Sequence, residues 1–211
     1  ATYEPPVLGI YLVRDDSGIP FLFLHGYEPD FRWEAFADAI EEIIDLYAVT
    51  DFTWVHSIPF PIPHTREIGV TVSGNRQDII DSVSEWKPQT QVPGNVLHLL
   101  EFKLHQRDLP CLGYVLLVPH YLSDSEYPAA GLAALEHLMS SSGLVFATDE
   151  LRDANREFLG KLKGNPFPLQ MTGKNVPASR RIAQAVCRRR LWGNPAAVQV
   201  LTGASRPWVG E

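Results

Sequence analysis

The chain has 211 residues, of which 45% are apolar and 20% are charged, and its formal net charge is −7. This is the composition of a globular protein with a sizeable core, and its length fits one domain with an extension. No apolar run approaches the roughly 18 to 20 residues that a membrane-spanning helix needs, and the first residues lack the basic region of a signal peptide. We therefore expect a cytoplasmic protein that does not enter a membrane.

The charge is unevenly distributed along the chain. Residues 1–160 contain 9 Lys and Arg against 24 Asp and Glu, whereas residues 161–211 contain 9 Lys and Arg and a single Glu. An acidic body repels nucleic acid, because phosphates are bound by clustered Lys and Arg. The basic segment could attract an anionic surface or pair with the acidic body. We predict an α/β core domain over residues 1–160 and a basic, irregular C-terminal extension over residues 161–211.

The first elements are two apolar strands joined by a turn. Leu8–Val13 and Pro20–His25 flank Asp15–Gly18, a good hairpin turn, and both strands are too apolar for a sheet with one solvated face. The clearest helix covers Phe31–Tyr47, where apolar residues recur at helical spacing and carboxylates occupy the other face. Asp30 is positioned to cap this helix.

Strands and helices alternate through the rest of the body. We expect further strands over Asp51–Phe60, Ile68–Ser73 and Leu112–Val118, and residues 75–86 are ambiguous. Further helices are expected over Val96–Asp108, Tyr127–Ser142 and Thr148–Leu162. This alternation predicts a layered α/β fold.

Three histidines follow apolar strands: His25, His64 and His120. Ligands of open α/β sheets bind at the carboxyl ends of strands, where such exits gather. Carboxylates lie near each histidine in the sequence, and Arg66 adds a fixed charge. A histidine beside a carboxylate can serve acid–base chemistry or bind a metal. Histidine at a strand–loop junction can also satisfy loop carbonyls, and we favour this structural role.

The sequence carries no recognised catalytic or cofactor motif. It has no glycine-rich phosphate loop, no GxSxG elbow and no HExxH pair. Ser123 and Ser125 lie in an acidic turn that disfavours an alkoxide, and Cys111 opens a buried strand. Neither Cys111 nor Cys187 has a metal-ligand spacing. We therefore assign no catalytic residue, no metal and no cofactor.

Between about residues 20 and 146 the chain carries five motifs in order: G-x-E-P-D-x-x-W, P-H-T-R, V-P-G, V-P-H-Y-L and a following Y-P. Together they resemble the actinobacterial branch of the proteasome assembly chaperone 2 family, a branch of unknown function. The resemblance implies a three-layer α/β/α sandwich with a mixed central sheet, similar to the phosphorylase/hydrolase type. It also implies a homo-oligomer, such as a trimer, and a proteasome-related protein partner.

The resemblance establishes no catalytic residue, but it supplies candidate site or fold residues. We take as the candidate strand-end site His25, Glu28, Asp30, His64, Arg66, His120, Tyr121 and Tyr127. The resemblance implies a further strand and helix upstream of the first residues, and we expect this unit of the sheet to be either absent or supplied elsewhere. The basic extension also differs from the acidic helical segment of the family.

Two functions compete. The favoured one is a non-enzymatic assembly or interaction protein, because guiding a partner needs shape and apolar burial rather than a nucleophile. The alternative is a hydrolase or small-molecule binder in which the strand-end residues converge on one pocket: His25, His64, Arg66 and His120 with Glu28 or Asp124. Nucleic-acid binding through the basic extension is the least favoured.

Overall fold

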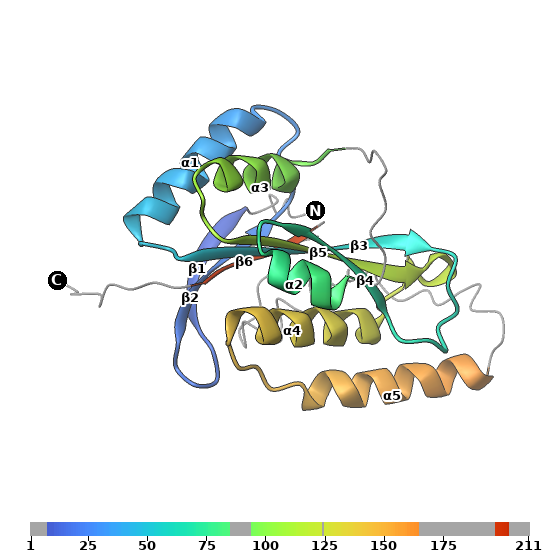
Figure 1. Ribbon diagram of the computed structural model, residues 1–211. Coiled ribbons are helices and arrows are strands. Elements are labelled where there is room, and N and C mark those ends of the chain that lie inside the picture. Colours follow the sequence, from blue (N-terminus) through green and yellow to red (C-terminus); the bar gives the residue numbers. More distant parts are fainter. Residues whose placement is uncertain (1–7, 85–93, 124, 165–196, 203–211) are drawn as a thin grey trace, which may run out of the picture.

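The computed structural model describes residues 8–84, 94–123, 125–164 and 197–202, the last of these by their backbone (Figure 1). A mixed sheet lies between two layers of helices. The described strands are β1 (Gly9–Arg14), β2 (Pro20–Gly26), β3 (Asp51–Phe60), β4 (Gly69–Gly74), β5 (Cys111–Pro119) and β6 (Ala197–Thr202). The described helices are α1 (Trp33–Leu46), α2 (Gln77–Val83), α3 (Val96–Gln106), α4 (Pro128–Ser142) and α5 (Asp149–Gly164), with a short 3-10 turn, η1, at His120–Leu122.

The strand order in the sheet is β1-β2-β6-β3-β5-β4. β3 and β5 pair in parallel, and the other pairings are antiparallel. Because β6 is antiparallel to both β2 and β3, the strands β2, β3 and β5 all point the same way. Their carboxyl ends therefore lie on one side of the sheet, which we call its carboxyl edge. Ligands of open α/β folds bind outside these strand ends.

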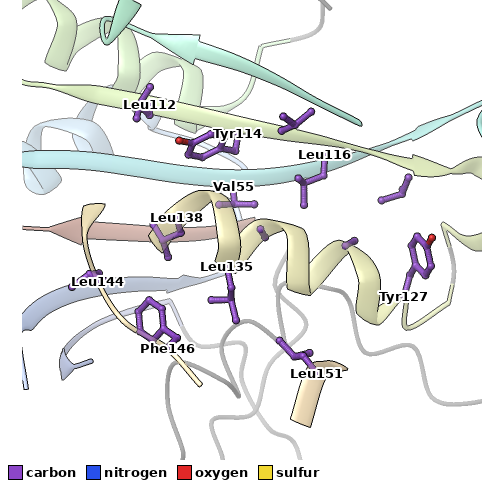
Figure 2. Packing of buried hydrophobic residues seen from close by; sticks show 14 of the residues in the cluster. Val55, Leu112, Tyr114, Leu116, Tyr127, Leu135, Leu138, Leu144, Phe146 and Leu151 are labelled. Carbon is purple, nitrogen blue, oxygen red and sulfur yellow. The ribbon is translucent and has the colours of Figure 1, made fainter. Parts of the chain in front are cut away.

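Alternating side chains of the strands bury both faces of the sheet. On one face Leu22 and Trp54 pack against α1 and α3. On the other, Val55 and Tyr114 meet Leu135 of α4 (Figure 2), and α2 and α5 extend the same core. The expected three-layer α/β/α sandwich with a mixed sheet is confirmed. Its two covered faces explain why the strands read as apolar runs.

One prediction about the C-terminal extension is wrong. Residues 197–202 form β6, which lies between β2 and β3 near the centre of the sheet, so this part of residues 161–211 is not irregular. Its sequence, AVQVLT, is rich in β-branched residues and pairs on both sides. α5 continues to Gly164, and the domain boundary near residue 160 remains a prediction. The rest of the extension lies outside the described residues.

No helix in the described ranges is long and apolar enough to cross a membrane.

A close approach at Gly113 generates a stability prediction. A Cβ atom added at Gly113 would lie 2.3 Å from the Trp54 ring and 2.6 Å from Ser73 Oγ, and Trp54 is fully buried. Gly113→Ala should therefore lower the free energy of unfolding by about 1–3 kcal/mol, since packed cores resist added volume.

The matched control is Gly160→Ala, at an exposed position of α5 where an added Cβ meets no atom within 4 Å. This control should raise stability by up to about 1 kcal/mol, because Ala is the better helix former. Urea unfolding of both variants measures the difference. Equal stability of Gly113→Ala and wild type would contradict the packing.

Candidate functional site

The candidate residues lie at two separate places along the carboxyl edge of the sheet. His25 lies at the level of Val55 in β3 and Tyr114 in β5, because β6 pairs with β2 and β3 in turn. His120 follows β5 six residues beyond Tyr114, an offset of about 20 Å along the strands at about 3.3 Å per residue. A single pocket that joins His25 to His64 and His120 is therefore not formed, and Asp124 lies outside the described residues.

The first place is the end of β3 and β5, where His64 and Tyr121 meet. The backbone N–H of His64 donates to Tyr121 Oη at 2.7 Å, which leaves the hydroxyl proton free to donate to His64 Nδ1 at 2.9 Å. The ring of His120 packs edge-on against that of Tyr121, with centroids 5.3 Å apart. The bonds between His64 and Tyr121 fasten the loop after β3 to η1, whereas the contact of His120 with Tyr121 lies within η1 itself.

A cleft of about 550 Å³ opens beside this contact. Its apolar surface comes from β4, α2, α4 and α5, and His64, Arg66 and Tyr127 contribute to its polar part. Burial raises the pKa of Tyr127. Asn155, from α5, also lines the cleft, and its Oδ1 atom is shielded from solvent and accepts no hydrogen bond from the described residues. Such a cleft has the volume of a small-ligand site, and His120 and Tyr121 lie outside its lining.

The second place is the loop between β2 and α1, where Glu28 serves as a helix cap. Glu28 Oε1 accepts a hydrogen bond from the backbone N–H of Val96 at 2.8 Å. Asn95 Oδ1 accepts from the N–H of His98 in the same first turn of α3. Two otherwise unpaired N–H groups of that helix are thereby satisfied. The carboxylate of Glu28 therefore stabilises α3 instead of facing the other candidate residues.

His25, near the end of β2, is 5% exposed, and its ring stacks on Phe23 of the core that α4 and α5 cover, with centroids 5.6 Å apart. A small cavity of about 40 Å³ lies under the loop, lined by residues that include Glu28 and His56. This space is far smaller than a ligand pocket. In the ranges that the structure describes, no three side chains of His, Cys, Asp and Glu are arranged to hold a metal ion.

The expected helix cap at Asp30 is wrong. α1 begins after Arg32, whose backbone is left-handed (φ 60°, ψ 42°) and whose side chain makes no capping hydrogen bond. Trp33 Nε1 instead donates to the carbonyl of Pro29 at 2.6 Å. This indole bond turns the chain into the helix and leaves Asp30 exposed to solvent.

Sequence reasoning missed a half-buried carboxyl group, Glu101 of α3. Trp54 Nε1 and Ser73 Oγ both donate to Glu101 Oε2, at 2.7 and 2.8 Å. Burial raises the pKa of Glu101, and these two hydrogen bonds oppose the rise. The available signal was its position four residues after the buried Leu97, on the same face of the helix. The group joins α3 to β3 and β4.

Cys111 lies beside this cluster and is buried. Burial, with the charge of Glu101 as the second cause, raises the pKa of the Cys111 thiol to about 11. A protonated thiol is a poor nucleophile. Cys187, the other cysteine, lies outside the described residues.

The fold and this arrangement define an α/β/α sandwich whose strand exits are fastened by polar contacts. The sequence profile of the PAC2 family matches residues 1–163. The chain belongs to the PAC2 family, and the resemblance to proteasome assembly chaperones found in its motifs is confirmed.

Two similar solved structures are actinobacterial proteins of unknown function. One, from Corynebacterium glutamicum, is 32% identical and has a TM-score of 0.74. The match covers 78% of this chain and 61% of the Corynebacterium chain. The other, from Mycobacterium tuberculosis, is 32% identical with a TM-score of 0.73 and covers 88% of this chain and 60% of its own. The chain thus spans about three fifths of the length of these relatives.

A more distant structure is a proteasome-assembly chaperone homologue from Mycobacterium tuberculosis. It is 16% identical, has a TM-score of 0.62 and covers 86% of this chain and 80% of its own. At this identity the likeness concerns the fold alone. No curated protein matches the chain.

The contact between His64 and Tyr121 predicts the effect of Tyr121→Phe. Removing the hydroxyl deletes two hydrogen bonds, but water can replace them in part because Tyr121 is 39% exposed. The free energy of unfolding should fall by about 0.5–1.5 kcal/mol, and backbone hydrogen exchange in residues 61–66 should become faster. Tyr27→Phe, at a tyrosine of similar exposure (41%) on another loop, is the control. Unchanged exchange in residues 61–66 would show that the contact does not hold the loop.

Glu101 predicts how stability depends on pH. Its pKa is raised from the ordinary value of 4.5. The folded protein therefore holds the proton of Glu101 at pH values above 4.5 at which the unfolded chain has released it. The associated stabilisation is complete below that value and is lost as the pH rises through the folded-state pKa. Glu101→Gln can still accept from Trp54 and Ser73 but has no such proton. The variant should therefore lose less stability than wild type as the pH rises.

Urea unfolding between about pH 4 and about pH 8 measures this slope. Glu42→Gln, at an exposed position of α1, should retain the wild-type profile. Parallel profiles for wild type and Glu101→Gln would show that the Glu101 carboxyl does not contribute to the pH dependence.

Proposed function

We propose that this PAC2 chain is a non-enzymatic, cytoplasmic assembly or interaction protein that forms a homo-oligomer and binds a proteasome-related protein. The observation that carries the proposal is the use of the strand-end polar groups within the protein itself. His64 bonds to Tyr121, and Glu28 caps α3. An acid–base site needs such groups aimed at a shared reacting atom.

The separation of the candidate residues also weighs against the hydrolase or small-molecule alternative. That alternative required His25 and His64 to converge with a carboxylate, whereas the strand register sets His25 about 20 Å back from His120 along the strand direction. The cleft beside His64 retains Arg66 but excludes His25 and Glu28 from its lining. A small ligand in that cleft would contact only His64, Arg66 and Tyr127 of the candidate strand-end residues.

The kind of partner is supported by family membership and by the fold shared with a proteasome-assembly chaperone homologue. The surface chemistry is compatible with protein binding. Interfaces combine apolar or aromatic anchors with a polar rim. The loop before α1 exposes Phe31 and α3 exposes Phe102, and charged side chains of α1 and α3 lie on the same helical layer.

Light scattering after size-exclusion chromatography tests the proposal. The protein is run alone and mixed with purified proteasome core subunits from an actinobacterium, with an unrelated acidic protein as the control. We expect a mass that is a multiple of the 23.6 kDa chain and a shift of the core-subunit peak that the control does not produce. A monomer that leaves the core subunits unshifted would refute the proposal.

Two histidine variants separate the proposed function from the alternative. His64→Ala removes the side-chain bond between the loop after β3 and η1, and His120→Ala removes a ring contact within η1, so both variants should perturb folding or assembly. If both variants fold and assemble as wild type does, yet lose binding of a small ligand found by screening, the pocket alternative replaces our proposal.

A further inference from the structure

The loop between β2 and α1 presents an aromatic side chain to solvent. Phe31 is 82% exposed, the highest value for a large apolar side chain in the described part of the chain. Tyr27 lies on the same loop and is 41% exposed. Exposed apolar residues are common singly, so exposure alone does not distinguish Phe31. What distinguishes it is the backbone that carries it.

The loop is fixed on both sides of Phe31. Before it, Glu28 accepts a hydrogen bond from Val96 at the start of α3. After it, the indole N–H of Trp33 donates to the carbonyl of Pro29, and proline itself restricts the backbone. Phe31 is thus held in solvent by one tertiary contact, from Glu28 to Val96, and one local contact, from Trp33 to Pro29.

The residue after Phe31 is in an unusual conformation for its position. Three described non-glycine residues have positive φ: Arg32, Ala48 and Asp108. Ala48 and Asp108 each follow the C-cap of a helix, where a left-handed residue ordinarily ends the helix. Arg32 instead precedes a helix, where extended backbone is usual. A left-handed arginine costs conformational free energy, and strain of this kind is concentrated at functional sites.

The helix that begins here carries an acidic outer face. Five carboxylates of α1 are accompanied by two cations of α3: Glu34, Asp38, Glu41, Glu42 and Asp45 with Lys103 and Arg107. Beside Phe31 itself, the charges of Asp30 and Arg32 offset each other. The neighbouring surface therefore keeps an excess of negative charge. A second copy would bring the same excess to this surface, so a basic partner is favoured.

We propose that Phe31 is the anchor through which this protein binds a protein partner whose apolar pocket has a basic rim. The inference rests on the proposed function and names the contact that performs it. A rigidly presented aromatic ring suits this task, because its burial is favourable and little conformational freedom is lost on binding. Arg32 acts as a positioning residue that directs the ring outward.

The test compares Phe31→Ala with Leu46→Ala in the full chain. Leu46 is 70% exposed at the other end of α1, so both truncations remove an exposed apolar side chain from the same helical layer. Each variant is titrated against purified proteasome core subunits from an actinobacterium, and thermal unfolding checks the fold. Phe31→Ala should weaken the Kd roughly 30-fold or more, as hot-spot residues do. Leu46→Ala should stay within about twofold of wild type.

Arg32→Gly tests the positioning role separately. Glycine adopts a left-handed conformation without strain but also permits many others. The variant should be at least as stable as wild type, yet bind the core subunits several-fold more weakly because the ring is less well placed. A purely local structural role would change stability without changing the Kd.

The outcomes are distinguishable. Binding by wild type that Phe31→Ala leaves unchanged overturns the anchor but not the proposed function. Absence of binding by wild type overturns the proposed function, and the anchor with it. If Phe31→Ala instead dissociates a homo-oligomer and leaves core-subunit binding intact, a second copy occupies this surface and our choice of partner is wrong.

Discussion

The parallel pairing of β3 with β5 sets the positions of His64, His120 and Tyr121 at the strand ends. The two strands stay in register from Phe52 to Phe60, well beyond the level at which β2 ends. Their exits consequently lie side by side, which brings the loop with His64 against Tyr121. β2 stops earlier, so its exit turns into α1 and contacts α3 instead. The two groups of polar residues are separated by strand length rather than by any property of the side chains.

This constraint explains which parts of the structure could be predicted. Apolar runs and their alternation with helices revealed the layers, because the burial of a strand is recorded in its own residues. The register of one strand relative to another cannot be read from the residues of either strand. Three exits that look alike in sequence, each with a histidine, therefore suggested one pocket where two places exist. β6 was missed because its position depends on backbone pairing with β2 and β3 across the sequence.

The loop before α1 shows how side-chain contacts can override a capping rule. Asp30 precedes the helix at a position where an aspartate commonly caps it. The chain instead follows two other contacts, one between Glu28 and Val96 and one between Trp33 and Pro29. The first spans 68 residues, and the second depends on an indole group that the apolar stripe assigns to the core. Glu101 of α3 could not be predicted for a similar reason. Its partners, Trp54 and Ser73, come from strands that are distant in the sequence.

The polar side chains at the strand exits already make hydrogen bonds within the protein, so they contribute little free energy to the binding of a ligand or partner. A carboxylate that already caps a helix, or a histidine already bonded to a tyrosine, would have to break that contact before serving a ligand. An exposed aromatic ring has no such competing bond. Water around the Phe31 ring is released when a partner covers it, and the fixed loop limits the entropy lost in the process. The hydrogen bond from Val96 to Glu28 thus has two effects: it occupies the carboxylate of Glu28, and it fixes the loop that presents Phe31 to a partner.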